Sequence, residues 1–185
     1  MILQPPELPS ELEFAALVRG RLVESIDKMP EDSRATITGL YFLLYDCVGN
    51  GIPAFYGEWQ INTLANIEHN QKASSRAAAR WDQYYFLRDD TWSPVFGNMF
   101  SGDKDLLLRV EADYAAHGVS EDERGARFWG LFSWLLKEFK SSFPLKERLP
   151  HCEMIFIDNS VGYGYEFTEL ICDGVFPEDF WQGAG

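Results

Sequence analysis

The stretch "FWGLFSWLLKEF", Phe128–Phe139, decides the fold, because its large apolar side chains are more than one face of a helix can hold. Ser120 and Glu123 stand ahead of it at the spacing of a capping box, which predicts a helix beginning after Ser120. A helix that is apolar around most of its circumference is typical of a core. We therefore expect this helix to lie at the centre of the molecule.

Two other segments predict helices with clear ends. Ser10 and Glu13 form a second capping-box pattern before apolar residues at helical spacing, and Pro30 ends that segment. The apolar residues are Ala15, Val18, Leu22, Ile26 and Met29. Leu106–His117 is also expected to be helical, with Gly118 closing it in the left-handed conformation.

Three further helices are predicted between these two. One begins at Asp32 or Ser33 and continues through "ATITGLYFLLYDCV" to Val48, where Gly49, Asn50 and Gly51 stop it. A shorter one is indicated by the apolar residues Trp59, Ile61, Leu64 and Ile67. The last is "SSRAAARWDQYYFL", residues 74–87, which the high helix propensity of alanine favours.

From Pro144 onward the pattern changes to that of strands. Cys152–Asp158 and Tyr165–Cys172 are rich in β-formers, and the turn residues Asn159, Ser160, Gly162 and Gly164 lie between them. This predicts an antiparallel β-hairpin that packs on the helices. The fold expected is one compact domain, mainly α with about five to six helices. Residues 1–143 form its helical part, and residues 144–185 form the hairpin and an acidic aromatic tail.

The net charge bounds the function. The 185 residues include 29 acidic and 16 basic side chains, a net charge of −13. Such a field repels nucleic acid and anionic membranes, and it accelerates encounter with a basic partner. No signal peptide and no apolar run of about 20 residues is visible. Together with three sparse cysteines, Cys47, Cys152 and Cys172, this favours the cytoplasm.

Sequence motifs for catalysis or ligand binding are missing. His151, Cys152 and Cys172 do not have the ligand spacing of a zinc site. There is no Gly-x-Ser-x-Gly motif, and the glycines of "GNGIPAFYG" come without the lysine of a phosphate loop. We therefore predict no catalytic residue, no bound cofactor and no metal ligand.

The acidic residues gather towards the C-terminus. Residues 141–185 hold 8 acidic and 2 basic side chains, whereas residues 34–100 hold 6 and 5. Aromatic residues lie among the C-terminal acids, and carboxylates around aromatic anchors are typical of a surface for a basic protein. The pair Asp89-Asp90 is added because it follows a predicted helix end, where the helix dipole does not favour carboxylates. The candidates for partner binding are Asp89, Asp90, Glu166, Glu169, Asp173, Glu178, Asp179 and Trp181.

One segment resembles a known family. Residues 30–66, about a fifth of the chain, resemble a bacterial family of small, acidic, mostly helical proteins that includes a DNA mimic. The family pattern is an acidic residue, then Asn-Gly-Gly-Phe, then aromatic-rich sequence. The matching residues are Asp46, Val48, Asn50, Gly51, Phe55 and Tyr56. Ile52 replaces the second glycine, Pro53 follows it, and the predicted hairpin is not part of the pattern. The resemblance implies a non-enzymatic protein whose carboxylates imitate DNA phosphates.

Three functions follow as hypotheses. The first is an immunity or inhibitor protein that binds and neutralises a basic bacterial toxin. The second is a DNA mimic that regulates a DNA-binding protein, as the resemblance implies. The third, from a different class, is an enzyme with an unrecognised site.

Overall fold

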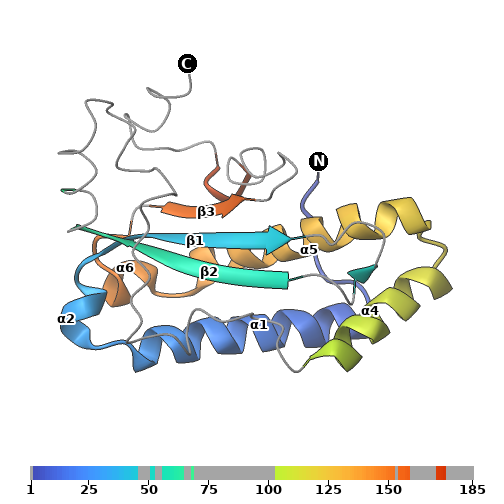
Figure 1. The fold of residues 1–185 in the computed structure, drawn as a ribbon, viewed down its shortest axis with the longest axis horizontal. Coiled ribbons are helices and arrows are strands. Elements are labelled where there is room, and N and C mark those ends of the chain that lie inside the picture. The colour runs from blue at the N-terminus through green and yellow to red at the C-terminus, as the bar shows by residue number, and fades with distance from the viewer. Residues whose placement is uncertain are drawn as a thin grey trace, which may run out of the picture.

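The computed structural model describes residues 2–45, 51–52, 56–64, 68, 103–152, 154–158 and 170–173. Within these residues three long helices and two short ones accompany a three-stranded sheet (Figure 1). The elements in chain order are α1 (Pro9–Lys28), α2 (Glu31–Arg34), β1 (Ile37–Tyr45), β2 (Tyr56–Thr63), α4 (Lys104–Ala116), α5 (Glu121–Ser142), α6 (Leu145–Arg148) and β3 (Met154–Asp158). The expectation of a mainly helical chain is confirmed for this part, but the sheet has more strands than expected.

The helix predicted from Phe128–Phe139 is confirmed as the centre of the core. It is part of α5, whose N-cap is Ser120; the Ser120 hydroxyl and the Glu123 carboxylate share a hydrogen bond of 2.5 Å. Phe132 packs edge-on against Phe42 of β1, with ring centroids 6.2 Å apart. One turn earlier on the helix, Phe128 contacts Phe14 of α1, with ring centroids 5.0 Å apart. α5 therefore joins the sheet to α1.

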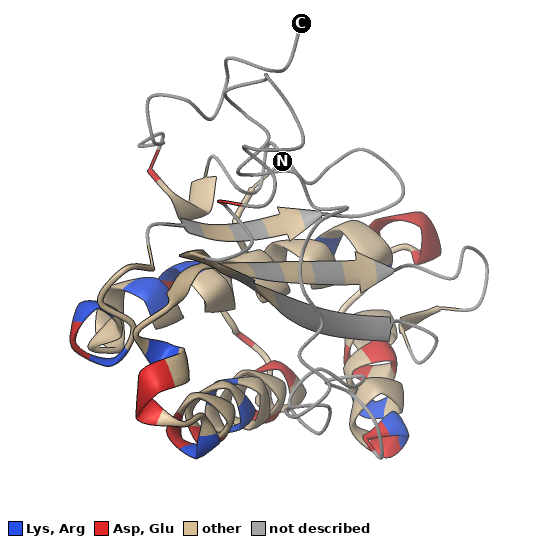
Figure 2. Ribbon diagram, turned by 60° about the vertical axis from the view of Figure 1, so that its left-hand side comes forward, with Lys and Arg blue, Asp and Glu red and all other residues tan. Residues whose placement is uncertain are grey.

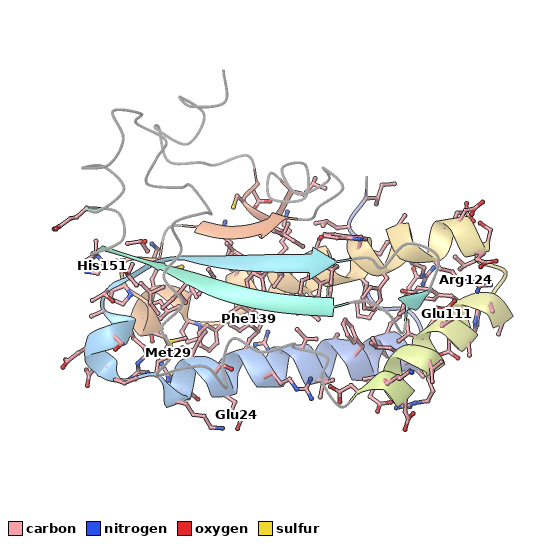
Figure 3. All side chains as sticks on the ribbon, in the orientation of Figure 1. Glu24, Met29, Glu111, Arg124, Phe139 and His151 are labelled. Carbon is pink, nitrogen blue, oxygen red and sulfur yellow. The ribbon has the colours of Figure 1, made fainter. Side chains whose placement is uncertain are left out.

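The first helix begins earlier than predicted. Its N-cap is Leu8, not Ser10, and Pro9 is the first helical residue. The carboxylate that receives backbone N–H groups is that of Glu11, which accepts from Glu7 N at 2.8 Å and from Leu8 N at 2.9 Å. Proline is well suited to the first helical position because its φ is already set and its missing N–H has no partner to lose there. The predicted end is confirmed, because α1 stops at Lys28 ahead of the buried Met29 (Figure 3).

The prediction of a long helix from Asp32 or Ser33 to Val48 is wrong. Only α2 is helical, and the apolar run becomes strand β1, in the middle of the sheet. Its residues are apolar at successive positions and include β-branched and aromatic types, which suit a central strand. A short continuous apolar run of this kind cannot be told from a buried helix by periodicity alone.

The predicted short helix around Trp59 and Ile61 is also wrong. Both residues lie in β2, which pairs with β1 in antiparallel register, Leu40 opposite Ile61 and Phe42 opposite Trp59. Helices α1 and α5 run along this sheet, while α4 lies at one end and α2 and α6 at the other (Figure 1). Among the described residues, the core is formed by buried side chains of the sheet, of α1, α4, α5 and α6, and of the segments that join them.

The C-terminal strand prediction is confirmed in part. Met154–Asp158 is β3, but within the described residues it pairs with β1, and in parallel, with Leu40 opposite Ile155. The antiparallel partner expected at Tyr165–Cys172 is not a strand at its end, because Leu170 and Ile171 form a helical turn. The rest of that segment, and the helix predicted at 74–87, lie outside the described residues.

Candidate functional site

Of the eight predicted partner-binding residues, Asp173 is the one within the described residues. It ends a helical turn, residues 170–173, and has a left-handed backbone with φ of 55°. The other seven, Asp89, Asp90, Glu166, Glu169, Glu178, Asp179 and Trp181, lie outside the described residues. Asp173 and the residues around it therefore form the described part of the candidate site.

Two lysines of α5 hold the turn that ends at Asp173. Lys137 forms an ion pair with the Asp173 carboxylate and donates a hydrogen bond to the Leu170 carbonyl oxygen at 3.0 Å. Lys140 reaches the carbonyl oxygen of Ile171 at 3.5 Å. The hydrogen bond from Lys137 lowers the pKa of Asp173. Asp173 thus already has a cationic partner within the chain, and its first role is to fasten this turn to α5.

The thiol of Cys172, which lies in this turn, is unreactive because of its surroundings. Cys172 is buried, and its Sγ donates to the carbonyl oxygen of Ile155 at 3.6 Å. Burial raises the pKa of Cys172, so the protonated form persists at neutral pH, whereas the thiolate is the nucleophile. Cys152 is buried as well, and His151 is exposed at the same end of the molecule (Figure 3). No three metal-ligating side chains gather anywhere in the described part of the chain.

A pocket of about 300 Å³ opens next to the turn, where α5 passes into α6 and β3 begins. Its apolar lining is buried and comes from Phe143, Leu145, Cys152 and Ile155. Two ammonium groups also line it: that of Lys140, and that of Lys146, which donates to the Cys152 carbonyl oxygen at 2.6 Å. Nothing in the sequence signalled this pocket, because its residues come from separate elements that only the fold brings together.

The strongest electrostatic perturbation lies elsewhere, between α1, α4 and α5. Glu11 is fully buried, and Arg127 donates to it through Nε at 2.9 Å. Burial alone raises the pKa of Glu11, but the hydrogen bonds from Arg127 and from two backbone N–H groups outweigh it and lower the pKa. Arg127 also lies 5.0 Å over the ring of Tyr114. Glu11 and Arg127 satisfy each other between α1 and α5, so this buried pair is an element of stability.

A second carboxylate fastens the segment that carries the family resemblance. Glu111 of α4 accepts from the backbone N of Ile52 at 2.6 Å and pairs with Arg124 of α5 at 3.1 Å (Figure 3). Gly51 has a φ of 69°, in the left-handed region, although the helix that it was expected to stop is strand β1. Tyr56 begins β2, whereas Asp46, Val48, Asn50 and Phe55 lie outside the described residues. Gly51 and Ile52 therefore act as an anchored corner.

Most charged residues of the described part lie on the helices (Figure 2). Most arginines there pair with carboxylates, among them Arg21 with Asp103, Arg109 with Glu13 and Arg148 with Asp27. The first turn of α5 carries Glu121 and Asp122, both exposed, at the helix end where negative charge is favourable.

Comparison of the chain with protein-family models, with curated proteins and with solved structures finds no match. None of the described helices is both long enough and apolar enough to span a membrane.

Proposed function

We propose that this chain is a non-enzymatic, cytoplasmic acidic protein that binds and neutralises a basic protein, as an immunity or inhibitor protein does with a bacterial toxin. The observation that carries the proposal is the net charge of −13 on 185 residues. A field of this sign accelerates association with a basic surface, and the acceleration falls with ionic strength.

The surface proposed for the partner begins at Asp173. Lys137 and Lys140 fasten the turn that ends there, which fixes the point on α5 from which the remaining chain continues. The sequence that follows combines Glu178 and Asp179 with the aromatic residues Phe176 and Trp181. Carboxylates supply steering, and large aromatic side chains supply most of the binding energy in protein interfaces.

The carboxylate with a shifted pKa at the start of α1 is not available as a general base. The Glu11 and Arg127 side chains, whose pKa values are shifted in opposite directions, are paired with each other. A general base needs a free lone pair within reach of a substrate, and this carboxylate is engaged by Arg127 and two backbone N–H groups.

The test is retention of cellular proteins on the immobilised full chain at about 50 mM and about 500 mM salt. The proposal predicts a basic protein that is retained at low salt and released at high salt. Neutralisation of that protein's toxicity in cells by co-expression of the chain identifies an immunity protein. Release of that protein from DNA by the chain identifies a DNA mimic instead. If no basic protein is retained at low salt, the proposal is wrong.

A further inference from the structure

We infer that the pocket between α5, α6 and β3 is a binding site for a small amphipathic anion, a medium-chain alkyl carboxylate. This site is independent of the proposed protein partner, because its charge has the opposite sign to that of the chain as a whole. The pocket lies at the end of the molecule where α6 follows α5 (Figure 1).

The polar side of the pocket suits a carboxylate. Lys140 and Lys146 both line it, in a chain whose net charge is −13. Each ammonium group has three N–H donors. Among the described residues each donates to one acceptor, a backbone carbonyl oxygen, at 3.5 Å from Lys140 and at 2.6 Å from Lys146. Cys152 belongs to the lining, so its carbonyl oxygen holds the Lys146 ammonium group beside the pocket, where the remaining N–H donors can bind an anion. Lys140 also lines the pocket, and its one long hydrogen bond, to Ile171 O outside the lining, leaves further donors.

The apolar side of the pocket suits a hydrocarbon chain. Phe143, Leu145 and Ile155 are each at most 8% exposed, and Phe143 is stacked on Phe139 with ring centroids 4.7 Å apart. The stacking fixes the shape of this wall. A volume of about 300 Å³ is equivalent to about ten water molecules in the liquid, and octanoate has about ten non-hydrogen atoms, so it matches the size of the pocket. The volume is at the lower end of the range for ligand pockets, which favours a small ligand.

Among the described residues that line the pocket, Glu147 is the one acidic side chain, and its charge distinguishes a bound anion from a neutral ligand. A bound carboxylate is repelled by Glu147 and attracted by Lys140 and Lys146. A neutral ligand responds to none of these charges. Removing the charge of Glu147 should therefore strengthen binding of the anion, whereas removing the charge of a lysine should weaken it.

The experiment is a titration of the full chain with octanoate, monitored by calorimetry and by saturation-transfer NMR. Octanol, which lacks the charge, and acetate, which lacks the long alkyl chain, are titrated for comparison. We expect octanoate to bind with a Kd of about 0.1–1 mM, and both octanol and acetate to bind more weakly. Lys140→Gln and Lys146→Gln should each raise the Kd about tenfold, and Glu147→Gln should lower it. Lys104→Gln, at an exposed lysine of α4, is the matched control and should leave it unchanged.

Three results would overturn the inference. The first is that octanoate does not saturate the protein up to about 10 mM. The second is that octanol binds as tightly as octanoate, and the third is that the lysine variants bind octanoate with the same Kd as the parent chain. Urea unfolding of each variant verifies that it is folded. Because Glu147→Gln acts in the opposite direction on an exposed side chain, its result decides the matter even if a lysine variant is unstable.

Discussion

The carboxylate of Glu11, in the first turn of α1, is paired with Nε of Arg127, in the second turn of the central helix α5, at 2.9 Å. The Glu11 side chain is fully buried, and that of Arg127 is 20% exposed. The same carboxylate accepts the backbone N–H groups of Glu7 and Leu8. One buried anion therefore fixes both the beginning of α1 and its contact with α5.

We predict that Glu11→Gln destabilises the protein by about 3 kcal/mol. Among the described carboxylates, the substitution leaves Arg127 with only its long contact to the exposed Glu7, at 3.4 Å. The matched control is Glu13→Gln, which removes a solvent-exposed pair with Arg109 and should destabilise the protein much less than Glu11→Gln does. Urea unfolding measures both. Equal losses of unfolding free energy in the two variants would mean that the buried pair stabilises the protein no more than the exposed pair does.

The pH dependence of the same variant has a defined sign. The pKa of Glu11 is lower in the folded state than its ordinary value. Its contribution is therefore fully present above the unfolded pKa of about 4.3 and is lost as the pH falls through the lower folded pKa. The difference in unfolding free energy between the parent chain and Glu11→Gln should narrow below about pH 4. A constant difference down to about pH 2 would contradict this assignment.

Substitution by alanine should change the stability in opposite directions at two helical glycines, Gly130 and Gly20. A Cβ at Gly130 of α5 would lie 2.7 Å from the backbone oxygen of Ile2 and 2.8 Å from Cγ of Gln4, so the N-terminal residues must shift. Gly130→Ala should destabilise by about 1–3 kcal/mol and should speed exchange of the Gln4 amide, which donates to Gly130 O at 3.1 Å. At Gly20 of α1 a Cβ meets nothing of the described residues within 4 Å. Gly20→Ala should stabilise by about 0.5–1 kcal/mol through helix propensity. Equal effects at the two positions would contradict the packing described here.

At Gly51 the stability cost of a clash with Glu111 can be distinguished from the cost of backbone strain. Gly51 and Gly118 both have positive φ, but only at Gly51 would a Cβ collide with the Glu111 carboxylate, at 2.7 Å. Gly51→Ala should therefore cost more than Gly118→Ala, for which about 1 kcal/mol of strain is expected. In a Glu111→Ala background the extra cost should disappear. A cost that persists in that background would assign it to the backbone alone.

The helices could be predicted where apolar residues recurred at helical spacing and a capping residue marked one end of the segment. α4 and α5 met both conditions, and Ser120 with Glu123 is the cap of α5. At α1 the period was right and the cap was wrong, because Pro9 and Glu11 make the helix start earlier than Ser10 and Glu13 indicated.

The strands were missed for a physical reason. β1 is apolar at successive positions, so it shows no two-residue alternation, and its pairing with β3 depends on residues more than a hundred positions away. Of the candidate site, the sequence indicated Asp173 but not the lysines that hold it. The pocket beside it depends on contacts between α5, α6 and β3 that no local pattern records.

The central claim is that an acidic C-terminal surface binds a basic protein, and the association rate constant tests it most directly. Two double variants remove the same charge: Glu178→Gln with Asp179→Asn in the tail, and Glu31→Gln with Asp32→Asn on the exposed α2. The retained partner's association with each is measured at low salt by stopped flow. The account predicts a several-fold slower association for the tail variant and a much smaller change for the α2 variant. Equal rates for the two variants would contradict it.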